Sequence, residues 1–176
     1  MKQNPALHKI PLVLCLLAVV LAMASCQSNE DKDLLPPIGY SPEAFAALEG
    51  DERVQFVKGW YDVESGTTGQ SWRWMSKQGE IHLRNQGKDM KLRLLGWVPL
   101  DLLPAPPTLR ITINGKELEQ LTPPKGHFTR EYKIPSSLQG TGEKSMLLIE
   151  SSAAAKPPQD TRELGYSLVN IVWEAQ

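Results

Sequence analysis

The pattern that most restricts the fold is a run of alternating apolar and polar residues that ends directly at a turn dipeptide. In Thr108–Ile113 the leucine and both isoleucines share one face of an extended strand. Asn114-Gly115 follows at once. This pair is a strong hairpin signal, because a type I′ turn needs positive φ at both central residues. We therefore expect Lys116–Leu121 to return as the antiparallel partner strand.

Short strand candidates separated by glycine, proline, asparagine and aspartate continue through the rest of the chain after Arg53. One sheet cannot bury its hydrophobic face together with five tryptophans, so two facing sheets are expected. The predicted fold is all-β, an antiparallel two-sheet β-sandwich of the jelly-roll type with eight or nine strands and a short N-terminal helix. The other strand candidates are Val54–Glu64, Ser71–Ser76, Glu80–Asn85, Met90–Trp97, Phe128–Ile134, Ser145–Ser151 and Tyr166–Trp173.

The first 25 residues have the layout of a secretory signal. Two lysines precede an apolar run, Ile10–Met23, which is shorter than the ~20 residues that a membrane-spanning helix needs. Met23-Ala24-Ser25-Cys26 resembles a bacterial lipobox. This resemblance implies that Cys26 carries lipid, including palmitate, and that residues 1–25 are removed. The alternative is ordinary secretion after Ala22-Met23-Ala24, which leaves Cys26 as a free thiol.

The resemblance to lipoproteins also implies a location and a membrane partner. Gln27 follows Cys26, as in lipoproteins sent to the outer membrane, so we expect a lipid-anchored protein of the cell envelope, at the outer membrane. Several acyl chains make such an anchor durable, since each buried methylene contributes ~0.8 kcal/mol. Cys15 lies in the segment that is removed, so no disulfide can form and the fold depends on its hydrophobic core.

Cleavage divides the chain into a signal peptide (1–25), a flexible tether (26–40), a short helical lead-in (41–52) and a β-sandwich domain (53–176). In the lead-in, Ser41 is the expected helix N-cap and Pro42 the first helical residue. After cleavage, 17 of the 19 basic residues remain against 20 acidic residues, a net charge of −3. With no block rich in lysine or arginine, this balance argues against a nucleic-acid partner.

The sequence offers little support for an enzyme. His82 and His127 lie in separate strand candidates, and neither belongs to an HExxH motif. No CxxC pair, GxSxG elbow or glycine-rich phosphate loop occurs. Carboxylates are scattered over strands and turns, so a glycan-active enzyme with paired carboxylates is the weakest alternative. We expect no catalytic residues, no metal and no cofactor.

Aromatic placement is more suggestive of a function. In an extended Ser71–Ser76 strand, Trp72 and Trp74 point to the same face about 7 Å apart, and Arg73 points to the other. Two coplanar indoles at this spacing form a platform for sugar rings. Alternatively, both indoles fill the space between the sheets, because tryptophan is usually largely buried. Trp97 and Trp173 lie in the most apolar strands and are expected in the core.

Charged residues near these aromatics have a binding and a structural interpretation. Arg73 is a candidate partner of Glu64 on the neighbouring strand. Asp160 and Arg162 share a face of an extended segment and form either a polar pair at the rim or a structural staple. In the staple, Asp160 accepts backbone N–H bonds, Arg162 bonds carbonyls of a neighbouring loop, and Gly165 meets a backbone demand. The candidate ligand-binding residues are Trp60, Tyr61, Glu64, Trp72, Arg73, Trp74, Asp160 and Arg162.

These motifs together resemble a known family of domains. The motifs are Gly59-Trp60-Tyr61 with Glu64, Trp72-Arg73-Trp74, the Asn114-Gly115 hairpin, and Asp160, Arg162 and Leu164-Gly165 before a final apolar strand. Over residues 53–175 the chain resembles galactose-binding, carbohydrate-binding-module-like β-sandwiches that bacteria append to glycosyltransferases and envelope polysaccharide proteins. The resemblance implies a non-catalytic envelope protein that binds carbohydrate. The alternative is a protein-interaction or assembly subunit of an envelope complex with no sugar site.

Overall fold

The computed structural model of the chain describes residues 47–67 and 69–176. The predicted signal peptide, the lipidation site Cys26, the tether and the Ser41 cap lie outside the described residues. Of the predicted helical lead-in, Ala47–Glu49 are helical. Within the described part of the chain, no helix has the length and hydropathy that crossing a membrane requires.

Strands make up most of the described chain, and every strand pairing is antiparallel. A short 3₁₀ helix, η3 (Leu100–Leu102), and a four-residue helix, α3 (Ser136–Gln139), lie between strands. The strands are β1 (Val54–Ser65), β2 (Ser71–Arg84), β3 (Met90–Trp97), β4 (Leu109–Ile113), β5 (Lys116–Leu121), β6 (His127–Ile134), β7 (Lys144–Ser151) and β8 (Tyr166–Ala175). The predicted candidates Ser71–Ser76 and Glu80–Asn85 are thus one continuous strand, β2.

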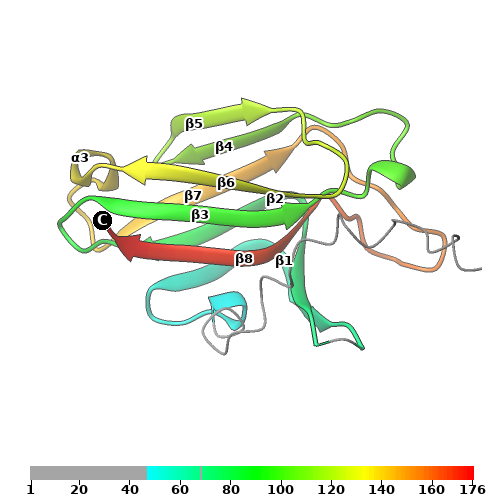
Figure 1. Cartoon of the computed structure of the whole chain (residues 1–176), viewed down its shortest axis with the longest axis horizontal. Helices are drawn as coiled ribbons and strands as arrows, with labels where there is room; N and C mark the ends of the chain where they lie inside the picture. Colours follow the sequence, from blue (N-terminus) through cyan, green and yellow to red (C-terminus); the bar gives the residue numbers. More distant parts are fainter. Residues whose placement is uncertain (1–46, 68) are drawn as a thin grey trace, which may run out of the picture. The chain divides into compact units, whose positions relative to one another are not determined.

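The hydrogen-bonded path runs β5-β4-β7-β2-β8-β3-β6, with β1 paired to β2. Strand β2 belongs to both halves of this path, because Gln78–Arg84 pairs with β7 whereas Arg73–Met75 pairs with β8. The path therefore folds into two layers joined along β2, and Figure 1 shows β8, β3 and β6 lying in front of β7. The predicted two-layer antiparallel β-sandwich is confirmed.

The change of partner along β2 coincides with irregular pairing to β1. The register between β1 and β2 shifts between Phe56 and Val63. Gly59 has φ +78°, and a Cβ there would lie 1.8 Å from the carbonyl oxygen of Gln78. Only glycine fits this close approach, so its place in β1 follows from the local backbone.

The interior is a single hydrophobic cluster to which both layers contribute. The leucine and isoleucines of the alternating segment on β4 all point into it, as the period of two predicts. Each fully buried aliphatic side chain contributes roughly 1.5–3 kcal/mol relative to exposure. The opposite wall comes from the other layer, mainly Met90, Leu92 and Leu94 of β3 and Leu168, Ile171 and Trp173 of β8.

The two terminal strands of the path, β5 and β6, are connected by side chains. Glu119 of β5 accepts a hydrogen bond from the Tyr132 hydroxyl at 2.7 Å and one from Arg130 Nε at 3.2 Å. Burial and the neighbouring Glu119 raise the pKa of the Tyr132 phenol. This polar bridge joins the two opposite ends of the hydrogen-bonded path.

Candidate functional site

Three tryptophans lie on the outer face of the layer that contains β2, β8 and β3. Met75 is fully buried in the core cluster, so Trp74 and Trp72 at alternating positions of β2 point away from the interior. Trp97 follows Gly96, which packs against the buried Tyr166 ring, so Trp97 also points outward. We call Trp72, Trp74 and Trp97 the aromatic face.

The strand register places Trp74 and Trp97 in one row across the sheet. Trp74 and Trp97 are both partners of Ser167 on β8, and His127 on β6 is the next partner of Trp97. The Trp74 and Trp97 ring centroids are 5.4 Å apart at an interplanar angle of 66°. Trp74 is only 7% exposed, whereas Trp72 and Trp97 are half-buried. Trp72 and Trp97 are therefore the partly accessible indoles of this face, and Trp74 packs against Trp97.

Glu64 positions one of the accessible indoles. It is the register partner of Trp72, and its Oε2 accepts a hydrogen bond from Trp72 Nε1 at 3.2 Å. Its other carboxylate oxygen, Oε1, accepts a hydrogen bond from Arg162 at 2.5 Å. The ring of Trp72 is thus fixed in orientation by a carboxylate that is itself held in place.

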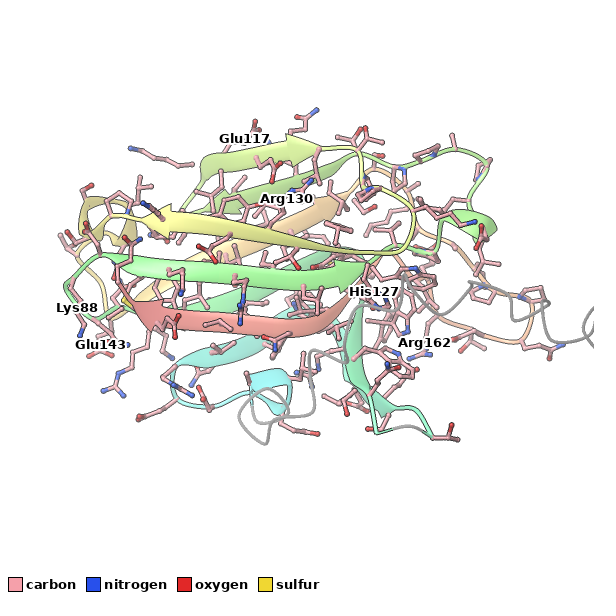
Figure 2. All side chains as sticks on the ribbon, viewed as in Figure 1. Lys88, Glu117, His127, Arg130, Glu143 and Arg162 are labelled. Carbon is pink, nitrogen blue, oxygen red and sulfur yellow. The ribbon has the colours of Figure 1, made fainter. Side chains whose placement is uncertain are left out.

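Arg162 connects the 153–165 segment to β1. Its guanidinium also donates to Asp160, from Nε to Oδ1 at 3.0 Å and from Nη2 to Oδ2 at 2.7 Å. Its Cζ lies 5.2 Å from the ring centroid of Tyr61, whose hydroxyl donates to the backbone oxygen of Glu163 at 3.2 Å. We call Tyr61, Glu64, Asp160 and Arg162 the polar cluster, and Figure 2 shows Arg162 at the same end of the sheet as His127.

The Asp160–Arg162 pair of the polar cluster stays ionised at neutral pH. Hydrogen bonds from the Arg162 guanidinium and backbone N–H lower the pKa of Asp160 to about 2. Asp160 and Glu64 together raise the pKa of Arg162. Two carboxylates and one guanidinium leave the cluster with one net negative charge.

The Asp160–Arg162 staple expected from the sequence is present, with a different second acceptor. Asp160 accepts the Arg162 backbone N–H at 2.9 Å, but Arg162 also bonds the Glu64 carboxylate where carbonyls of a neighbouring loop were expected. As predicted, the backbone requires glycine at position 165, because a Cβ there would lie 2.3 Å from the Ser76 carbonyl oxygen. Its N–H donates to Met75 O at 2.9 Å, which ties the segment to β2.

Two candidate residues lie away from the aromatic face. The expected Arg73–Glu64 pair is wrong: Arg73 Cζ lies 4.4 Å from the Phe56 ring centroid, and Glu64 bonds Arg162. The reason is the register, since Arg73 is opposite Val63, which packs against the core, and faces away from Glu64. Burial lowers the pKa of Arg73. Trp60 also packs against the core, and its Nε1 donates to Glu80 O at 3.2 Å.

Trp97 and Trp173 were both expected in the core, and the structure confirms this for one of them only. Trp173 is 4% exposed and belongs to the core cluster, as predicted. Trp97 does not belong to that cluster, so its expected place in the core is wrong. A signal for this was present in the sequence: on β3 the even-numbered Met90, Leu92 and Leu94 face inward, which turns an odd-numbered residue outward.

The described residues contain no group of three or more histidine, cysteine, aspartate or glutamate side chains placed to hold a metal ion. The structure has a depression of about 190 Å³ at the β1 bulge, lined by Lys58, Gly59, Ser76, Gln78 and Glu80. A cavity of about 330 Å³ lies around α3. The aromatic-face tryptophans line neither of these two cavities.

Similarity to known proteins is found among solved structures and not among sequences. No protein-family model and no curated protein matches the sequence. Among solved structures, the CBM35 module from Paenibacillus barcinonensis is 16% identical, with 73% of this chain and 96% of that chain covered and a TM-score of 0.40. The CBM22-2 xylan-binding domain of Xyn10C from the same organism is 12% identical, with 76% and 98% covered and a TM-score of 0.47.

A third similar structure is TmCBM61 in complex with β-1,4-galactotriose. It is 8% identical, with 78% of this chain and 99% of that chain covered and a TM-score of 0.41. With TM-scores below 0.5, these likenesses assign neither a family nor a ligand to the chain.

Proposed function

We propose that this chain is a lipid-anchored, non-catalytic protein of the cell envelope whose β-sandwich binds carbohydrate on the aromatic face. The observation that supports the proposal is the pair of half-buried indoles, Trp72 and Trp97, on an outer sheet surface beside the Glu64 carboxylate. The apolar C–H faces of sugar rings stack on such indoles, and carboxylates accept hydrogen bonds from sugar hydroxyls.

Preorganisation favours binding at this surface. The Trp72 ring is held by Glu64, and Glu64 is held by Arg162. The Trp97 ring packs edge-on against the buried Trp74. Neither indole has to be ordered when a ligand arrives, so the entropic cost of binding is reduced.

The charge beside the surface restricts the kind of glycan. The net negative charge of the polar cluster opposes acidic sugars, because like charges repel at short range. Neutral oligosaccharides are therefore the preferred class.

Calorimetric titration of the full-length protein in detergent tests this function. The probes are neutral xylo-, gluco- and galacto-oligosaccharides, with polygalacturonate as the acidic comparison. Trp72→Ala and Trp97→Ala should each weaken the neutral glycan that binds by about tenfold, which corresponds to ~1.4 kcal/mol of stacking energy. Met146→Ala is the matched control, because Met146 is an exposed apolar residue on β7 in the other layer.

Thermal unfolding of each variant shows whether it remains folded. Wild-type affinity in a folded Trp97→Ala variant would contradict the aromatic face as the site. If no glycan binds the wild-type protein, the carbohydrate function itself is rejected and the alternative role as an assembly subunit is favoured.

A further inference from the structure

The cavity around α3 lies at the other end of β2 from the aromatic face. Trp72 is near the start of β2, whereas Asn85, which immediately follows that strand, contacts the loop after α3. At about 3.3 Å per residue, the length of β2 separates the two regions by roughly 40 Å. The cavity has a volume of about 330 Å³ and is lined by Asn114, Lys116, Ser137–Gly140, Gly142 and Lys144.

The lining is positively charged. Lys116 and Lys144 are its only ionisable side chains, and no acidic side chain contributes to it. Lys144 Nζ donates to the uncharged Gln55 Oε1 at 2.7 Å. Neither lysine forms an ion pair within the described residues. Figure 2 labels Glu117 and Glu143, the acidic sequence neighbours of these lysines, and both lie outside the lining.

Hydrogen bonds from two asparagine side chains, Asn114 and the partly buried Asn85, hold the wall of the cavity in one conformation. Asn114 donates from Nδ2 to Leu138 O at 2.8 Å, and its Oδ1 accepts the Met146 N–H at 2.8 Å. Asn85 Nδ2 donates to Gln139 O and to Gly142 O, both at 2.8 Å. These bonds hold α3 and the loop after it from two separate turns, so the shape of this wall is determined without a ligand.

Gln139 and Ser145 complete this support. Gln139 is 2% exposed, and its Nε2 donates to Lys88 O at 2.6 Å. The fully buried Ser145 donates from its hydroxyl to Asn85 Oδ1 at 2.6 Å. A hydrogen-bonded buried network of this kind is rigid, because breaking any member leaves a buried polar group unpaired. The cavity is therefore preformed.

We infer that this cavity binds a small anion, a carboxylate or phosphate group on a molecule of about monosaccharide size. Two lysine ammonium groups are point-charge donors for such oxygen atoms. The volume lies in the range of small-molecule sites. This second site is independent of the carbohydrate surface, since the two share no residue.

Titration of the full-length protein in detergent with inorganic phosphate and with sodium glucuronate, at low ionic strength, tests this inference. NMR shift changes at Gly140 and Gly142 report binding. Lys116→Gln and Lys144→Gln should each weaken anion affinity at least fivefold. Methyl glucoside, which has a similar size and no charge, should cause no saturable change at these glycines.

Lys88→Gln is the matched control, because it removes one positive charge at the same end of the molecule without altering the lining. It should change anion affinity less than twofold. An equal loss in Lys88→Gln and Lys116→Gln would overturn the inference in favour of general charge attraction, and so would the absence of saturation with both anions. Trp97→Ala should leave phosphate binding unchanged, so failure here is distinguishable from failure of the carbohydrate function.

Discussion

At the residue scale, some side chains pack directly against the backbone because glycine, which has no Cβ atom, occupies the contact position. Gly96 on β3 is buried against the ring of Tyr166, which is itself 2% exposed in the core. A Cβ at Gly96 would lie 2.1 Å from the Tyr166 ring. The ring therefore occupies the space that a side chain would fill, one residue before Trp97 of the aromatic face.

We predict that Gly96→Ala destabilises the fold by about 3 kcal/mol, because the added methyl group overpacks a filled core. Urea unfolding followed by tryptophan fluorescence measures the change. Gly142→Ala is the matched control: a Cβ there has its nearest neighbour, Lys144 O, at 3.8 Å, so the change should stay within ~0.5 kcal/mol. Equal unfolding midpoints for the two variants would show that Tyr166 moves away freely.

At the element scale, the long segment between β7 and β8 is ordered by few but strong contacts. Ala155 and Leu164 form a β-bridge within it, and both are buried. Arg162 ties it to β1 through Glu64, and Gly165 ties it to β2. The polar cluster thereby holds the segment beside the aromatic face, so loss of the cluster should affect both stability and the site.

We predict an acid-dependent loss of stability that originates in Asp160. Its pKa falls from the ordinary 3.8 to about 2 in the folded protein, chiefly through the Arg162 hydrogen bonds. A lowered carboxyl pKa stabilises the fold above the unfolded value, and this contribution disappears as the pH falls from about 4 to 2. The stability difference between wild type and Asp160→Asn should therefore be full at pH 5 and shrink toward pH 2.

Urea unfolding at pH values from 5 to 2 measures this difference. Asp101→Asn is a suitable control, because Asp101 is an exposed aspartate in η3. A difference between wild type and Asp160→Asn that stays constant across this range would show that Asp160 acts only through neutral hydrogen bonds.

At the scale of the whole molecule, the proposed anchor and the two proposed sites have separate tasks. The proposed lipid on Cys26 would attach the chain to a membrane. The aromatic face and the α3 cavity belong to opposite ends of β2, so both can be occupied at once. Such an arrangement suits a tethered protein that holds ligands near a surface.

We predict that Cys26→Ser moves the protein from the membrane fraction to the soluble fraction, because the change removes the thiol to which lipid is attached. Without acyl chains, the ~0.8 kcal/mol per buried methylene that holds the protein on the bilayer is lost. Fractionation of cells expressing the full-length protein measures the change. Cys15→Ser lies in the segment expected to be removed and should fractionate like wild type. Membrane retention of Cys26→Ser would reject the anchor.

Much of the fold could be predicted from the sequence, because side-chain alternation and turn chemistry are local. The alternating leucine and isoleucines of β4 face the core, and Asn114 has φ +48° and Gly115 φ +78°, as the hairpin signal requires. The bounds of β3 and β5 agree with the predicted strands. The close spacing of Asp160 and Arg162 in sequence indicated that the two residues act together, but it left open a structural staple or a polar pair at the rim.

The remaining features depend on which strands become neighbours, and no local pattern contains that information. β2 is one strand shared by two layers, a choice made by its pairing to β7 and β8. Glu64 bonds Arg162, 98 residues away, in place of the nearby Arg73. Period-two alternation assigns residues to two faces, but only the packed structure decides which face is covered. For this reason the sequence by itself determined most of the strands and the hairpin turn, whereas the tertiary structure decided the partners of Arg162, the aromatic face and the α3 cavity.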